Sequence, residues 1–169
     1  MLATIYIFLF LQLLFVGWID LKFKRISNWW ALMNVLIFLG LLFIDPHTYA
    51  FRFSTFFFSL AFLIVGFSLF MAKIMGAGDV KYLFSFYLLV PQRYHDSVFL
   101  ALLYVTISVG TVLLMYNALK NFNRLWYALV FRDIHMIKVV FGKKFSFAPI
   151  ILASWIWFGW EKRKELFPW

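Results

Sequence analysis

The chain has 169 residues, of which 65% are hydrophobic and 14% are charged, and its mean hydropathy is +0.90. This composition excludes a soluble domain, and apolar runs of about 16 to 20 residues are long enough to cross a bilayer core of about 30 Å. The net charge of +9 is better explained by basic cytoplasmic loops than by nucleic-acid binding. We therefore expect an all-α polytopic membrane protein that forms one domain over residues 1–169.

The first half of the chain contains three apolar runs. The first predicted span, residues 2–19, lacks a basic start and a small-residue cleavage site, so it is expected to be retained rather than removed as a signal peptide. Three basic residues follow within residues 20–28, which places this loop in the cytoplasm and the N-terminus outside. The second span covers residues 29–44, and the third, residues 53–72, returns the chain to the cytoplasm.

A short apolar run, residues 80–90, comes next. At 1.5 Å per residue it would be only about 17 Å long, which is less than the bilayer core. Either the helix starts earlier, or the membrane is locally thin, or the segment does not span alone. We favour a short span whose cytoplasmic end is recessed near a water-accessible cleft. An outer turn at residues 91–96 leads into the fifth span, residues 97–117.

Residues 118–147 form the only long hydrophilic stretch. Basic residues recur there at helical spacing between apolar ones, a pattern that fits a helix on the cytoplasmic lipid surface and equally a solvated loop. A last span over residues 145–160 gives about six transmembrane helices with both termini outside. The inside loops then hold 11 Lys and Arg residues and the outside holds 5, which supports the topology, although residues 162–164 place three of the five in the outer tail.

Two acids occupy special places in this layout. Asp20 ends the first span and Asp79 begins the fourth, both on the cytoplasmic side, so helix packing could bring their carboxyl groups face to face. An acid near the bilayer core costs at least about 2.5–3.5 kcal/mol on insertion scales, which makes it a functional candidate by default. Four amides could form interhelical hydrogen bonds. They are Gln12, Asn28, Asn34 and Asn117.

Two facing carboxyl groups can hydrolyse a peptide bond without a metal or a thiol. One is protonated and the other ionised, because two like charges at close range cannot easily coexist. The ionised group takes a proton from water, and the protonated group stabilises the charge that develops on the carbonyl oxygen. The chain has no cysteine, and its three histidines match no metal-ligand spacing, so we expect no metal and no cofactor. The simpler interpretation is that Asp20 and Asp79 are helix caps or interfacial charges, with Lys81 as a positive-inside anchor.

Three motifs in order carry a resemblance to a known family. Asp20-Leu-Lys-Phe-Lys-Arg25-Ile26-Ser-Asn28 resembles the first-aspartate motif of the bacterial type IV prepilin peptidases. Gly76-Ala-Gly78-Asp79-Val-Lys81 resembles their second motif, Gly-x-Gly-Asp-x-Lys. Phe145-Ser-Phe147-Ala-Pro149 is similar to the Pro-Phe-x-Pro segment of their last span. Together with the six-span layout, these motifs cover nearly the whole chain.

The resemblance implies an aspartic endopeptidase of the bacterial cytoplasmic membrane, with its active site facing the cytoplasm. Such enzymes remove the leader peptide of prepilins or pseudopilins, so the expected partners are this substrate and the lipid bilayer. Asp20 and Asp79 would be the catalytic pair. The motif residues that would support them are Gly76, Gly78, Lys81, Arg25, Asn28 and Pro149.

The departures from the family pattern indicate which branch of the family the chain resembles. Ser27 stands where the family usually has proline, and Lys144 or Phe145 stands where the last motif has its first proline. Larger members carry an N-terminal cytoplasmic domain with a cysteine-bound zinc and also methylate the new pilin N-terminus. This chain has neither that domain nor any cysteine. It therefore resembles the small, peptidase-only branch that serves Flp (tight-adherence) pili.

Two alternatives remain open at this point. Presenilin-like intramembrane proteases also use Gly-x-Gly-Asp, but their other acid follows a tyrosine within a span, and here Asp20 follows Ile19. The second alternative is a non-enzymatic scaffold subunit or small transporter of a pilus or secretion system, with Asp79 and Lys81 as an ion site. A transporter is expected to show paired repeats, and the sequence shows none.

Overall fold

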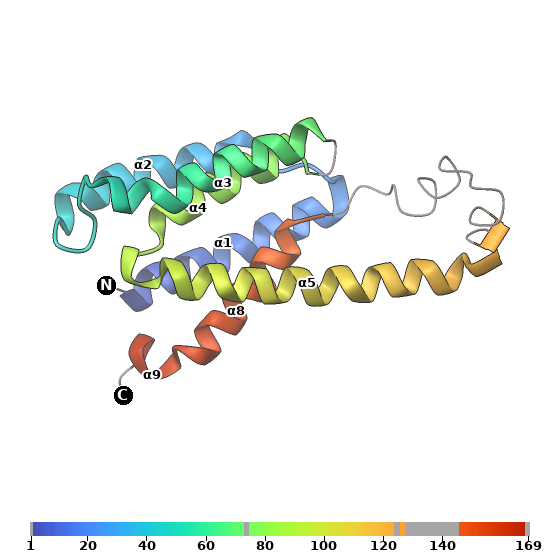
Figure 1. The fold of residues 1–169 in the computed structure, drawn as a ribbon. Coiled ribbons are helices and arrows are strands. Elements are labelled where there is room, and N and C mark those ends of the chain that lie inside the picture. The colour runs from blue at the N-terminus through green and yellow to red at the C-terminus, as the bar shows by residue number, and fades with distance from the viewer. Residues whose placement is uncertain (1, 73–74, 124–125, 128–145, 168–169) are drawn as a thin grey trace.

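The computed structural model describes residues 2–72, 75–123, 126–127 and 146–167, and in this part of the chain it contains helices and turns but no strand (Figure 1). The all-α prediction is confirmed. In chain order the elements are α1 (Leu2–Phe23), α2 (Asn28–Ile44), α3 (Phe53–Met71), α4 (Ala77–Leu89), the 3-10 turn η1 (Gln92–Tyr94), α5 (His95–Lys120), α8 (Ala148–Glu161) and α9 (Arg163–Leu166).

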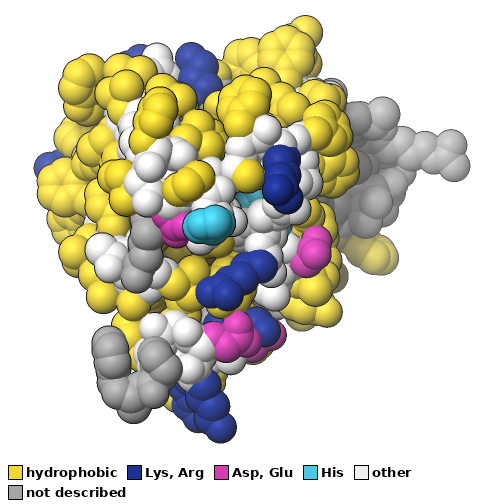
Figure 2. Space-filling view, turned by 90° about the vertical axis from the view of Figure 1, so that its left-hand side faces the viewer, with side chains coloured by type: hydrophobic (Ala, Val, Ile, Leu, Met, Phe, Trp, Pro, Cys, Tyr) yellow, Lys and Arg dark blue, Asp and Glu magenta, His cyan; other side chains and the backbone are white. Residues whose placement is uncertain are grey.

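The surface of the bundle is that of a membrane protein. Among the described residues, α1, α3 and the η1–α5 stretch are long and apolar enough to cross a bilayer, and α2 is a shorter apolar helix. Large apolar side chains lie exposed along these helices, as lipid contact requires. Figure 2 shows one end of the bundle, where charged side chains gather and hydrophobic ones surround them. The membrane class is thus confirmed, and the count of six spans stays a prediction.

The helices pack as two sets of three. Helix α4 packs against α2 and α3, and α8 packs against α1 and α5 (Figure 1). Aromatic rings fill the boundary between the sets: the centroids of Phe86 in α4 and Trp155 in α8 are 5.2 Å apart, and those of Phe62 in α3 and Phe99 in α5 are 6.1 Å apart. Helix α1, which carries Asp20, and helix α4, which carries Asp79, therefore belong to different sets.

Helix α4 is short, as the sequence indicates, and its ends explain why. It begins at Ala77, three residues before the apolar run, and its 13 residues span about 20 Å. Its last carbonyl groups need partners in apolar surroundings. The Tyr49 hydroxyl donates to the Leu89 carbonyl at 2.7 Å, and His95 Nε2 bonds to the Val90 carbonyl at 2.8 Å. Side chains from outside α4 therefore complete it before Pro91.

The predicted surface helix or loop over residues 118–147 falls mostly outside the described residues. Helix α5 carries the fifth span on to Lys120. The helix of the last predicted span, α8, begins at Ala148 with Pro149 in its first turn, a position that favours proline because its missing N–H needs no partner there. The tail then turns back against the bundle, where Leu166 is buried and the Tyr94 hydroxyl donates to Glu165 at 3.1 Å.

Candidate active site

A cavity of about 1140 Å³ opens where α1 and α3 end and where α2 and α4 begin. Both predicted acids line it. Five of the six supporting motif residues line it as well, namely Arg25, Asn28, Gly76, Gly78 and Lys81. The sixth, Pro149, lies in the first turn of α8 and does not line the cavity. Apolar side chains of α1 and α3, including Ile19, Phe70 and Met71, complete the wall.

Asp20 lies in the last turn of α1, where its side chain is held by the start of α8. The residue is only 3% exposed. Its Oδ2 accepts a hydrogen bond from the backbone N–H of Ala148 at 3.3 Å, and its carbonyl oxygen accepts one from the Ser146 hydroxyl, also at 3.3 Å. The first N–H groups of a helix have no partner within it, and they favour a negative charge nearby. Asp20 therefore caps a helix from a distant part of the sequence.

Asp79 lies in the first turn of α4 and is 8% exposed. Its Oδ2 accepts a hydrogen bond from the backbone N–H of Gly76, the N-cap residue, at 3.1 Å. This is the reciprocal half of a capping box, which satisfies one free donor at the helix start. Asp79 thus takes part in capping α4 from the third helical position rather than as its N-cap, and this hydrogen bond fixes the direction of the Asp79 side chain.

The two carboxyl groups share one site. Both line the same cavity, Asp20 from the last turn of α1 and Asp79 from the first turn of α4. Each is held by a backbone N–H at a helix start, so neither relies on a flexible side chain for its position. The geometry joins the two acids that the sequence singles out, and their catalytic role stays a prediction.

The glycines of the second motif allow two close approaches. A Cβ atom at Gly78 would lie 2.7 Å from the Ile26 carbonyl oxygen, which brings the loop after α1 against the start of α4. A Cβ atom at Gly76 would lie 2.8 Å from Asp79 Oδ2. Distances under 3.0 Å are too short for a real Cβ contact. Glycine at position 78 therefore lets the two aspartate motifs meet, whereas glycine at position 76 leaves room for the Asp79 carboxylate within the second motif.

The loop between α1 and α2 is shaped by its own backbone and side chains. Lys24 has a φ of 51°, and its N–H donates to the Asp20 carbonyl at 2.8 Å, which ends α1 in a left-handed cap. Ser27 is the N-cap of α2, where its hydroxyl oxygen accepts from the Trp29 N–H at 3.3 Å, and this explains how serine replaces proline here. Asn28 Oδ1 accepts from Lys81 Nζ at 3.3 Å, a second link between the two motifs.

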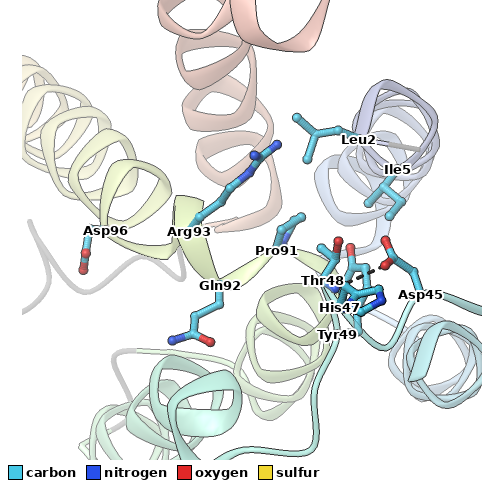
Figure 3. Close-up of a pocket in the computed structure, with 10 residues that line it drawn as sticks. All are labelled: Leu2, Ile5, Asp45, His47, Thr48, Tyr49, Pro91, Gln92, Arg93 and Asp96. Carbon is cyan, nitrogen blue, oxygen red and sulfur yellow. Dashed lines mark hydrogen bonds between the residues drawn. The ribbon is translucent and has the colours of Figure 1, made fainter. Parts of the chain in front are cut away.

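A second cavity, of about 750 Å³, lies at the opposite end of the bundle (Figure 3). The loop after α2 and the turn after α4 form it, together with the start of α1. Asp45, the C-cap of α2, accepts a hydrogen bond there from the Thr48 N–H at 3.2 Å. Among the described residues there is no group of three His, Asp or Glu side chains that could hold a metal ion. Neither acid of the first cavity reaches this one.

The fold and site define an all-helical membrane protein with two buried acids, one at the end of α1 and one at the start of α4. Residues 7–116 match the type IV leader peptidase family. The match covers more than half of the chain and includes Asp20 and Asp79, so the chain belongs to this family and is a membrane peptidase. The resemblance noted from the motifs is thereby confirmed. No curated protein and no solved structure matched the chain.

The sequence did not reveal which backbone groups hold the acids. The bond from Ala148 to Asp20 joins positions 128 residues apart, and Ala148 lies beyond the matched residues 7–116. The available signal was Pro149, since proline in the first turn of a helix places free N–H groups just beside it. Such donors attract a carboxylate.

Proposed function

We propose that this protein is an aspartic endopeptidase that removes the leader peptide of Flp-type prepilins or pseudopilins. Its active site would face the cytoplasm from the bacterial inner membrane. The observation that carries the proposal is the meeting of Asp20 and Asp79 in one cavity, in a chain of the type IV leader peptidase family.

The chemistry follows from the two carboxyl groups. A water molecule between them loses a proton to the ionised carboxylate as it attacks the scissile carbonyl carbon. The protonated carboxyl donates a hydrogen bond to the carbonyl oxygen and stabilises the charge that develops there. When the tetrahedral intermediate collapses, a proton passes to the leaving amine and the peptide C–N bond breaks. The backbone donors at Ala148 and Gly76 keep both acids in position throughout.

The position of the cavity suits a substrate that is partly in the membrane. Apolar residues at the ends of α1 and α3 form one wall, and polar loop residues form the other. A cavity of about 1140 Å³ exceeds the roughly 300–1,000 Å³ of ordinary small-molecule sites, so it can take several residues of an extended peptide. Lys24, Arg25 and Lys81 around it support a cytoplasmic orientation.

The proposal is tested by co-expression with a small Flp-type prepilin in a host that lacks its own leader peptidase. Gel mobility and mass spectrometry follow the loss of the leader. We expect cleavage by the wild type and by Asp96→Asn, which changes an acid in the first turn of α5 at the opposite end of the bundle, and none by Asp20→Asn or Asp79→Asn. Each variant is compared at equal membrane levels. An uncut prepilin in the presence of the wild type, when a known leader peptidase cuts it in the same host, would overturn the proposal and favour the scaffold or transporter alternative.

A further inference from the structure

A ring of buried polar side chains lies deeper in the bundle than the two acids. Gln12 of α1 donates from Nε2 to Asn34 Oδ1 of α2 at 2.6 Å, and Asn34 Nδ2 donates to the Ser85 hydroxyl of α4 at 3.3 Å. The Ser85 hydroxyl donates to the Tyr82 carbonyl at 2.9 Å. The Tyr82 hydroxyl closes the ring by donating to Gln12 Oε1 at 3.0 Å. All four residues are buried, with exposed fractions of 5% or less.

This ring joins the two helices that carry the acids. Gln12 precedes Asp20 on α1 by eight residues, or about 12 Å along the helix. Tyr82 follows Asp79 on α4 by three residues, so both lie on the same side of that helix. The hydrogen bond between Gln12 and Tyr82 therefore crosses from one helix to the other about one turn beneath Asp79.

The boundary that the ring crosses is otherwise filled mainly by apolar side chains, and one further hydrogen bond, from His95 of α5 to the Val90 carbonyl, lies at the far end of α4. Asp20 is fixed to α8 within one set of helices, and Asp79 is fixed at the start of α4 within the other. The separation of the two carboxyl groups thus depends on how the sets are placed relative to each other. Aromatic rings such as Phe86 and Trp155 also pack across this boundary, but apolar contacts are less directional than hydrogen bonds and specify the register of the two sets less sharply. Hydrogen bonds in a dry interior define it, because each broken bond leaves a buried group unpaired.

We infer that Gln12, Asn34 and Tyr82 are positioning residues, which hold α1 against α2 and α4 so that Asp20 and Asp79 meet at the separation that peptide hydrolysis requires. The inference rests on the proposed function, since it assigns these residues to the same reaction. They do not touch the substrate. Their effect passes through the helices to the acids, where small displacements strongly reduce the rate.

A matched pair of tyrosines makes the kinetic test. Tyr82→Phe and Tyr87→Phe each remove one buried hydroxyl from α4, but only the Tyr82 hydroxyl has a hydrogen-bond partner in the described structure. The folded fraction of each variant is isolated by gel filtration, and prepilin cleavage is measured. We expect Tyr82→Phe to lower kcat by about 10- to 100-fold with KM nearly unchanged, and Tyr87→Phe to match the wild type. Equal kcat values for the two variants would overturn the inference.

A double-mutant cycle tests the bond itself. Gln12→Leu should lower kcat at least as much as Tyr82→Phe does, because it removes the bond to Asn34 as well as the bond to Tyr82. In the Gln12→Leu background, Tyr82→Phe should cause no further loss of kcat, because the bond between Gln12 and Tyr82 is already absent. Gln12→Leu alone leaves both the Tyr82 hydroxyl and Asn34 Oδ1 unpaired, whereas the double variant leaves only Asn34 Oδ1 unpaired, so the double variant is expected to fold at least as well as Gln12→Leu. Additive losses in kcat would contradict the inference.

A measurement without catalysis separates the inference from the proposed function. The chain has no cysteine, so Asp20→Cys with Asp79→Cys provides the only thiol pair. A short bifunctional thiol reagent should cross-link this pair in membranes, and Tyr82→Phe, but not Tyr87→Phe, should cause a loss of cross-linked product. An equal yield in the two backgrounds would overturn the inference even if the wild type cut no prepilin. Failure of the wild type to cut, with the expected loss of cross-linking, would contradict only the proposed function.

Discussion

Asp20 of α1 accepts a hydrogen bond from the backbone N–H of Ala148, the first residue of α8, across 128 positions of the chain. One carboxylate therefore has two tasks, since it caps the last apolar helix and lines the cavity with Asp79. A substitution at either acid can act on packing as well as on chemistry. The predictions that follow use variants that separate these effects.

Gly78 is predicted to be intolerant of a side chain. A Cβ atom there would lie 2.7 Å from the Ile26 carbonyl oxygen, and backbone cannot easily move away. We expect Gly78→Ala to cost about 1–3 kcal/mol of stability and to lower prepilin cleavage by about tenfold or more. Thermal unfolding in detergent and cleavage by the folded fraction measure the two effects. Gly40→Ala is the control, since nothing lies within 4 Å of its new Cβ atom. Equal behaviour of the two variants would refute the close approach.

Gly66 of α3 is predicted to set the spacing of α3 and α4. A Cβ atom at Gly66 would lie 2.8 Å from Cγ1 of Val80. Gly66→Ala should therefore destabilise the protein by about 1–3 kcal/mol through overpacking. In a Val80→Ala background the obstructing methyl groups are gone, so the same substitution should cost less. Unfolding midpoints of the wild type, the two single variants and the double variant measure this coupling. An equal cost in both backgrounds would show that the two residues do not meet.

Lys24 is predicted to carry backbone strain. Its φ of 51° lies in the left-handed region, which costs a residue with a Cβ atom about 1–2 kcal/mol. Lys24→Gly should raise the unfolding midpoint, and Lys24→Val should lower it. Lys22→Gly loses the same charge inside α1 and should lower the midpoint, because glycine weakens a helix. If Lys24→Gly were as destabilising as Lys22→Gly, the left-handed cap would be excluded.

Asp45, in the loop after α2, is predicted to make stability depend on pH. Its hydrogen bond to the Thr48 side chain holds the pKa of the Asp45 carboxyl below its ordinary value. A carboxyl group with a lowered pKa in the folded state stabilises the fold above its unfolded pKa of about 3.9, and this contribution is lost as the pH falls through the folded value. The difference in unfolding midpoint between the wild type and Asp45→Asn should therefore shrink between neutral and acidic pH. A difference independent of pH would contradict this.

The sequence predicted the parts of this molecule better than their contacts. Hydrophobic runs gave the helices because lipid imposes length and composition on any span. The pairing of Asp20 with Asp79 could be anticipated because both acids lie at span ends on one side of the predicted topology. Gln12 and Asn34 were expected to form interhelical bonds, and they do. The hydrogen-bond partners of Gln12 and Asn34 could not be predicted from the sequence, because many arrangements of apolar helices bury similar surfaces. The sequence alone does not distinguish Tyr82 from other buried aromatic residues, because its hydrogen bond to Gln12 depends on the packing of α1.

The rate of leader removal by purified protein tests the central claim most directly. A synthetic Flp-type prepilin is mixed in micelles with excess wild type, Asp20→Asn, Asp79→Asn or the double variant, and the first turnover is followed by mass spectrometry. The account predicts that each single variant loses about a thousandfold or more in rate. It also predicts that the double variant is no slower than either, because the two acids act as a unit. A folded single variant that cuts within about tenfold of the wild-type rate would contradict the two-aspartate mechanism.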